Sequence, residues 1–145
     1  SKELFGQALL EDYFTDYLAQ LDTLLQTPGL SGRERLLRYF EQWRTTQADD
    51  CCEQKCQGVK LSAEVSDLSE AMRLTLRDGT ERVIARLAQC AADGVEDGSL
   101  AAAEPLPTAR TLYSLWLGAS LLAKLHRNAE PLEHAWTASL RVLAA

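Results

Sequence analysis

The sequence holds few of the residues that most often carry catalysis. It has only two histidines, His126 and His134, which lie on either side of Pro131. It has no metalloprotease, serine-hydrolase, phosphate-loop or dinucleotide-binding motif. Adjacent carboxylates such as Asp49 and Asp50 have no feature that would make one an acid and the other a base. We therefore expect a protein that is not an enzyme and needs no cofactor.

Long apolar runs and excess positive charge are also missing. The longest uncharged stretch near the end, 111–123, lies between Arg110 and Lys124. It is shorter than the roughly 18 apolar residues that a membrane span requires. No basic segment followed by an apolar run opens the chain, so we expect no signal peptide. The net charge of -6 makes the chain a poor nucleic-acid binder by bulk electrostatics.

The composition is that of one globular domain. The chain has 145 residues, of which 46% are hydrophobic and 25% are charged. This length and this hydrophobic content are enough to build a core. Four cysteines in a chain of this size do not resemble a secreted disulfide scaffold, so we expect a cytoplasmic protein with reduced thiols. Cys90 lies on an apolar helix face, and we expect it to be buried.

Apolar residues recur at three- and four-residue steps along most of the chain, as in amphipathic helices. Pro28 and Gly29 end the first helix, and Ser31 begins the second with Glu34 in a capping-box pattern. Further helices are predicted over 59–65, from Asp67 to a turn at 94–98, over 108–127, and from Pro131 onward. No strand-like alternation appears, so we predict an all-α domain of about six helices.

The predicted helix over 108–127 is apolar around nearly its whole circumference. Such a helix must be buried on more than one side. It either threads the core of this chain or turns one side toward a second copy. We favour a homodimer in which the last two helices of each subunit form a four-helix bundle. The interface residues expected on this basis are Leu112, Leu115, Trp116, Ala119, Leu122, Trp136, Leu140 and Leu143.

Three of the four cysteines lie close together in a polar stretch. Cys51 and Cys52 are adjacent, and Cys56 follows four residues later. Zinc would need a second ligand pair at chelating spacing, so we expect no metal, and a disulfide between the adjacent pair would be strained. Cys56 precedes a predicted helix and lies near Lys55 and Lys60, and both features favour a reactive thiolate. Cys56 is therefore either a sensor thiol or an inert loop cysteine.

Several segments resemble a known family. The opening 1–5 is similar to the junction in TetR-family regulators where the fourth helix follows the DNA-binding helix-turn-helix. Other blocks resemble the NemR-type repressors of that family, which control N-ethylmaleimide reductase and related detoxification genes. The blocks that carry this resemblance are 59–65, 67–73, 112–119, 123–124 and 130–133.

The resemblance implies a homodimeric transcriptional repressor that releases operator DNA when a sensor cysteine reacts with an electrophile or oxidant. Cys56 stands at the position of that cysteine, and Lys124 at that of a matching lysine. Cys51 and Cys52 are secondary candidate thiols. The resemblance further implies a TetR-type regulatory domain over 1–145, with the helix-turn-helix expected before Ser1. The chain alone is then not expected to bind DNA.

Two other functions compete with a thiol-based repressor. A regulator of the same family could bind a small apolar effector reversibly in a pocket between helices. The candidate pocket residues are Tyr13, Phe40, Trp43, Tyr113 and Trp116. Alternatively, the chain is a stand-alone helical dimerisation module. Ordinary core packing is the competing explanation for most of the aromatic residues.

Overall fold

The structure is a computed structural model that describes residues 1–50, 69–101 and 104–144. Within these residues the chain forms α-helices and no strand, which confirms the predicted all-α fold. The predicted short helix over 59–65 lies outside the described residues. The helices are α1 (Lys2–Leu25), α2 (Gly32–Asp50), α4 (Glu70–Glu96), α5 (Pro105–His126) and α6 (Glu130–Val142).

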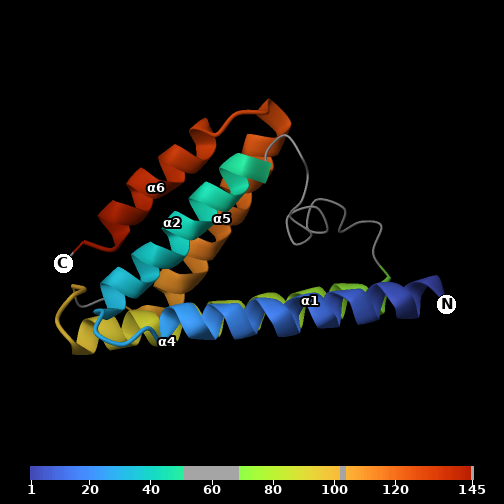
Figure 1. The fold of residues 1–145 in the computed structure, drawn as a ribbon, viewed down its shortest axis with the longest axis horizontal. Coiled ribbons are helices and arrows are strands. Elements are labelled where there is room, and N and C mark those ends of the chain that lie inside the picture. The colour runs from blue at the N-terminus through green and yellow to red at the C-terminus, as the bar shows by residue number, and fades with distance from the viewer. Residues whose placement is uncertain (51–68, 102–103, 145) are drawn as a thin grey trace.

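The helices form two groups (Figure 1). The first pair, α1 and α4, runs side by side along the longest axis of the molecule. The second group consists of α2, α5 and α6, which rise together from one end of that pair. The N-terminal end of α1 projects at the opposite end. Because α2 and α5 both pack against α4, that long helix connects the two groups.

The pairing of α1 with α4 depends on a glycine opposite an aromatic ring. Phe14 on α1 and Gly79 on α4 are both buried. A Cβ atom at position 79 would overlap the Phe14 ring. Gly79, which costs about 1 kcal/mol relative to alanine in a helix interior, is therefore required by the packing. This contact fixes where the two helices lie against each other.

The N-terminus of α2 is held against the C-terminal end of α4. The amide of Gly32 donates to the carboxylate of Asp97 at 2.9 Å, and the amide of Arg33 donates to the hydroxyl of Ser99 at 3.1 Å. The backbones of Gly32 and Gly94 approach so closely that a Cβ atom at position 32 would overlap Gly94. The predicted turn at 94–98 is wrong in its first half, because α4 continues to Glu96 through this contact.

The helix starts agree in part with the sequence. The amide of Glu34 donates to the hydroxyl of Ser31 at 3.1 Å, which confirms the predicted start of α2. The cap of α4 is Ser69, whose hydroxyl accepts from the amide of Met72, whereas Asp67 lies outside the described residues. The helix predicted to start at about 108 begins three residues earlier, at Pro105, which is the start of α5. Proline fits the first turn of a helix because the backbone amides there have no acceptor within the helix, so the N–H that proline lacks is not missed.

Candidate functional site

The predicted sensor thiols Cys51, Cys52 and Cys56 lie outside the described residues. Among the described residues, Cys90 is the only cysteine. Its side chain is 2% exposed, and its thiol donates to the carbonyl of Gly32 at 3.4 Å. Burial raises the pKa of the Cys90 thiol to about 11. Since the thiolate is the reactive species, Cys90 is an inert core residue, as the sequence predicted.

Lys124, the predicted partner of the sensor thiol, lies half-buried in the last turn of α5. Its position next to the C-terminus of the helix complements the helix dipole. The resemblance assigns Lys124 and Cys56 to the same sensor site, and Cys56 lies outside the described part of the chain. The pairing therefore stays a prediction.

The predicted pocket residues come from three helices, and four of them form one aromatic cluster. The Phe40 ring stacks on Trp116 at 5.4 Å between centroids, and Trp43 contacts Tyr113 at 5.7 Å and Trp116 at 5.9 Å. Phe40 and Trp116 are both 0% exposed, so the space around their rings is filled by other side chains of the core. The indole of Trp43 donates to the hydroxyl of Ser120 at 2.7 Å, which ties α2 to α5.

Tyr13, the fifth predicted pocket residue, joins this cluster through two tyrosines that the sequence analysis missed. Tyr13 stacks on Tyr17 at 5.7 Å, and the hydroxyl of Tyr17 lies 2.5 Å from that of Tyr39 on α2. Burial, followed by the neighbouring Tyr17, Tyr113 and Tyr13, raises the pKa of Tyr39 well above its ordinary value. All four tyrosines of the chain thus gather where α1, α2 and α5 meet. Phenol groups beside apolar rings can orient a small, mostly apolar ligand.

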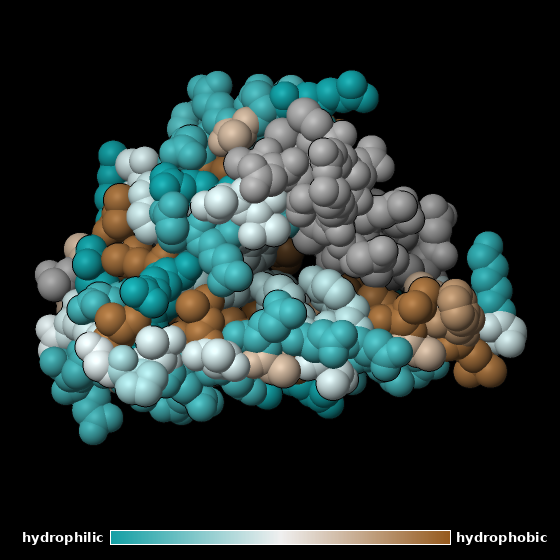
Figure 2. Space-filling model, viewed as in Figure 1, coloured by the Kyte–Doolittle hydropathy of each residue, from teal (hydrophilic) through white to brown (hydrophobic). Residues whose placement is uncertain are grey.

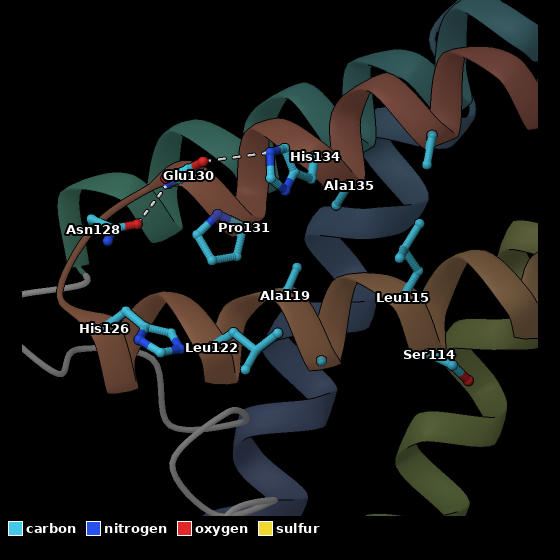
Figure 3. A pocket seen from close by; sticks show the side chains of 12 residues that line it. Ser114, Leu115, Ala119, Leu122, His126, Asn128, Glu130, Pro131, His134 and Ala135 are labelled. Atoms are coloured by element: carbon cyan, nitrogen blue, oxygen red, sulfur yellow. Dashed lines mark hydrogen bonds and ion pairs between the residues drawn. The ribbon is translucent and has the colours of Figure 1, made fainter.

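A second feature is a groove of about 770 Å³ between α5 and α6 (Figure 3). Three predicted interface residues, Leu115, Ala119 and Leu122, line it from α5. Both histidines of the chain also line it, His126 at the end of α5 and His134 on α6. The remaining lining residues are Ser114, Gly118, Asn128, Glu130, Pro131, Ala135 and Ala138.

The structure separates the predicted interface residues into two sets. Leu112, Trp116 and Leu143 are at most 1% exposed and belong to the interior of this chain. Trp136 is half-buried, with the guanidinium of Arg44 lying 4.7 Å above its ring, and Leu140 is 37% exposed. Of the predicted interface residues, those that line the groove and Leu140 are therefore the ones left for an interface on α5 and α6. Apolar periodicity could not separate the two sets, because both faces of α5 are apolar.

Residues 32–139 match the family model for the Tetracyclin repressor-like, C-terminal domain. The chain belongs to the TetR family. Over 136 residues, which are 93% of this chain and 68% of the relative, it is 45% identical to the HTH-type transcriptional repressor NemR of Escherichia coli K12. It is 31% identical to the HTH-type transcriptional repressor DhaR of Mycobacterium sp. strain GP1, over 99% of this chain and 71% of DhaR.

The fold agrees with this membership. The crystal structure of E. coli NemR in its reduced form matches with a TM-score of 0.89 and 44% identity, covering 99% of this chain and 75% of that one. TetR-family repressors bind DNA and act as dimers, and they are regulators and not enzymes. Among the described residues, no helix is long and apolar enough to cross a membrane.

Proposed function

We propose that this chain is the regulatory domain of a TetR-family repressor that senses reactive electrophiles or oxidants through a cysteine thiol and then releases its operator. The observation that carries the proposal is the 45% identity with NemR over 93% of the chain. A defined reduced form of that relative has been crystallised, which fits a protein in which thiol state matters. The DNA-binding domain is proposed to precede Ser1.

The reactive thiol is proposed to be Cys56. Cys90 is buried, and its pKa is raised to about 11, so it is not available as the sensor. Lys55 and Lys60 lie close to Cys56 in sequence and favour its thiolate. With N-ethylmaleimide, the sulfur adds to the carbon–carbon double bond, and the neighbouring carbon takes up a proton from water.

A direct test uses the complete protein on its operator DNA at a stated salt concentration, followed by fluorescence anisotropy. The proposal predicts tight binding in the reduced state and release after addition of N-ethylmaleimide. Residues 1–145 alone are the matched negative control, because an acidic domain without the reading helix is expected to give no specific binding. Retention of DNA by the fully alkylated repressor would contradict the proposal.

Dimerisation is proposed to occur through the groove between α5 and α6, with a second copy as the occupant. Leu122 is 46% exposed and Leu125 is 68% exposed on this end of α5. Gly118 lies in the same helix and has open space where a Cβ atom would lie. A mid-helix glycine that the chain's own packing does not need fits the close approach of a partner helix.

A second candidate function is reversible binding of a small effector at the tyrosine cluster. The observation that favours it is the convergence of three phenol groups on that of Tyr39, whose ring contacts Phe40 and Trp43. The two functions are separated by two variants of the complete protein. Thiol sensing predicts that Cys56→Ser abolishes release and Tyr39→Phe does not, whereas a reversible effector predicts the opposite.

A further inference from the structure

Arg44 on α2 contacts three side chains at once. Its guanidinium donates to the carboxylate of Glu41 on the same helix at 2.7 Å and to that of Glu133 on α6 at 3.1 Å. The guanidinium carbon also lies 4.7 Å from the centre of the Trp136 ring on α6. A planar guanidinium can pair with carboxylates and lie on an aromatic ring at the same time. These four residues, Arg44, Glu41, Glu133 and Trp136, are called the Arg44 bridge below.

The Arg44 bridge attaches the first half of α6 to α2. Among the described residues, the pair of Arg44 and Glu133 is the only ion pair between these two helices. Just after the other end of α6, the guanidinium of Arg33 donates to the carbonyl of Leu143 at 2.7 Å. Glu41 holds the Arg44 guanidinium from within α2, so the group is already oriented toward α6. The two helices are thus held together at two points, of which the Arg44 bridge is the one near the start of α6.

The position of α2 gives this contact a functional setting (Figure 1). The beginning of α2 is bound to the end of α4 through Gly32 and Asp97, and α4 packs along α1. The DNA-binding domain is proposed to precede Ser1, at the start of α1. The far end of α2 is Asp50, and Cys51 follows directly in the sequence. Through the Arg44 bridge, α2 is also attached to α6, which lines the groove proposed for the second subunit.

We infer that the Arg44 bridge stabilises the operator-binding arrangement of this chain and opens when the operator is released. This inference rests on the proposed function. The bridge is present in a structure that matches reduced NemR with a TM-score of 0.89. A contact that is made in one state and lost in the other shifts the equilibrium between the two states. Arg44 is thus a positioning residue that favours operator binding without touching DNA.

The Arg44 bridge is built to open more easily than the contacts around it. The α5–α6 contact between Trp116 and Ser139 is fully buried. In the bridge, by contrast, 24% of the Arg44 side chain and 56% of the Glu133 side chain are exposed. Hydrophilic residues cover the upper end of the group formed by α2, α5 and α6 in the space-filling view (Figure 2). Water can therefore solvate the separated charges, whereas opening the buried contact would leave a polar group without a partner.

The test measures operator binding by the complete protein in fluorescence anisotropy, at one stated salt concentration. Arg44→Met keeps the apolar stem of the side chain and removes the guanidinium. In the reduced state this variant is expected to bind the operator about tenfold more weakly than the wild type, within the usual range of coupling between sites. After full alkylation with N-ethylmaleimide, both proteins are expected to bind equally weakly, because the bridge is already open. Arg44→Lys keeps the charge but not the planar fork, so its reduced form is expected to lie between the two.

Arg110→Met is the matched control. Arg110 donates two hydrogen bonds of 2.8 Å to Glu81, so this change also removes an ion pair between two helices, α5 and α4. Both variants are expected to lower the melting temperature by less than about 4 °C. The control is expected to keep its operator affinity within about twofold of the wild type.

Equal operator binding by reduced wild type and reduced Arg44→Met would overturn the inference. So would an equal loss in Arg44→Met and Arg110→Met, because the role of Arg44 would then be one of general stability. The comparison of the reduced proteins needs no thiol chemistry. Failure of the sensing proposal is recognised separately, as retention of the operator by the alkylated wild type.

Discussion

Trp116 on α5 donates its indole N–H to the hydroxyl of Ser139 on α6 at 2.8 Å, and both side chains are 0% exposed. The same hydroxyl donates to the carbonyl of Ala135 at 2.7 Å. This buried pair sets the spacing of α5 and α6, and the groove between these helices depends on that spacing. Two apolar side chains would pack here with less geometric specificity.

Ser139→Ala is expected to lower the free energy of unfolding by about 1–3 kcal/mol, because it leaves the buried indole N–H of Trp116 without an acceptor. Urea unfolding measures the loss. Trp116→Phe/Ser139→Ala removes the donor as well, so the double variant is expected to lose less than the sum of the single changes. Strict additivity would show that the hydrogen bond contributes little.

Gly79→Ala is expected to destabilise the chain by about 1–3 kcal/mol, although alanine is the better helix former. The added methyl group would overlap the ring of Phe14. Gly118→Ala is the matched control, since it lies in a helix with open space around the added methyl group. In the monomeric state this control is expected to gain up to about 1 kcal/mol. Equal effects of the two substitutions would contradict the packing described for α1 and α4.

These contacts show which parts of the molecule the sequence could predict. Local chemistry was sufficient for the start of α2 at Ser31 and for the proline in the first turn of α6. Contacts between distant residues had no local signal. Tyr17 and Tyr39 meet only because α1 packs on α2. The requirement for glycine at position 79 depends on a ring 65 residues earlier in the chain.

In the candidate site, too, local patterns were predictable and contacts between distant residues were not. Periodicity identified α5 as apolar on every side but could not show which side the chain fills itself. Periodicity therefore predicts both Leu112 and Leu122 as interface residues, yet Leu112 is 1% exposed and Leu122 is 46% exposed. The sensor position came from a resemblance between sequence blocks, and Cys56 lies outside the described residues. Its role remains a proposal.

Leu122→Glu is expected to weaken dimerisation by about 100-fold or more, because a second copy in the groove would bury an unpaired charge. Sedimentation at micromolar concentration measures it. The wild type is expected near twice 16.1 kDa and the variant nearer to 16.1 kDa. Leu106→Glu, at an exposed site outside the groove, is the control and should stay dimeric. A monomeric wild type, or no difference between the variants, would exclude the groove as the interface.

The buried thiol of Cys90 makes stability depend on alkaline pH. Burial raises its pKa from 9.0 to about 11 in the folded state, so the unfolded chain releases this proton first. The stabilisation is fully present below pH 9 and is lost as the pH rises from about 9 to about 11, by about 2 kcal/mol. Urea unfolding of wild type and Cys90→Ala between pH 8 and 11 measures it. The free energy of unfolding should fall more for the wild type than for Cys90→Ala over that range. Parallel pH dependences of the two proteins would contradict the raised pKa of Cys90.

The measurement that tests the central claim most directly is the order in which the thiols react. The reduced protein is treated with N-ethylmaleimide for increasing times, and peptide mass spectrometry quantifies the label on each cysteine. Cys56 is expected to be modified first and the buried Cys90 last. Operator release by the complete repressor is expected to follow the labelling of Cys56. This release is expected to be absent in the Cys56→Ser variant. Faster labelling of Cys51, Cys52 or Cys90, together with undiminished release by Cys56→Ser, would contradict the account.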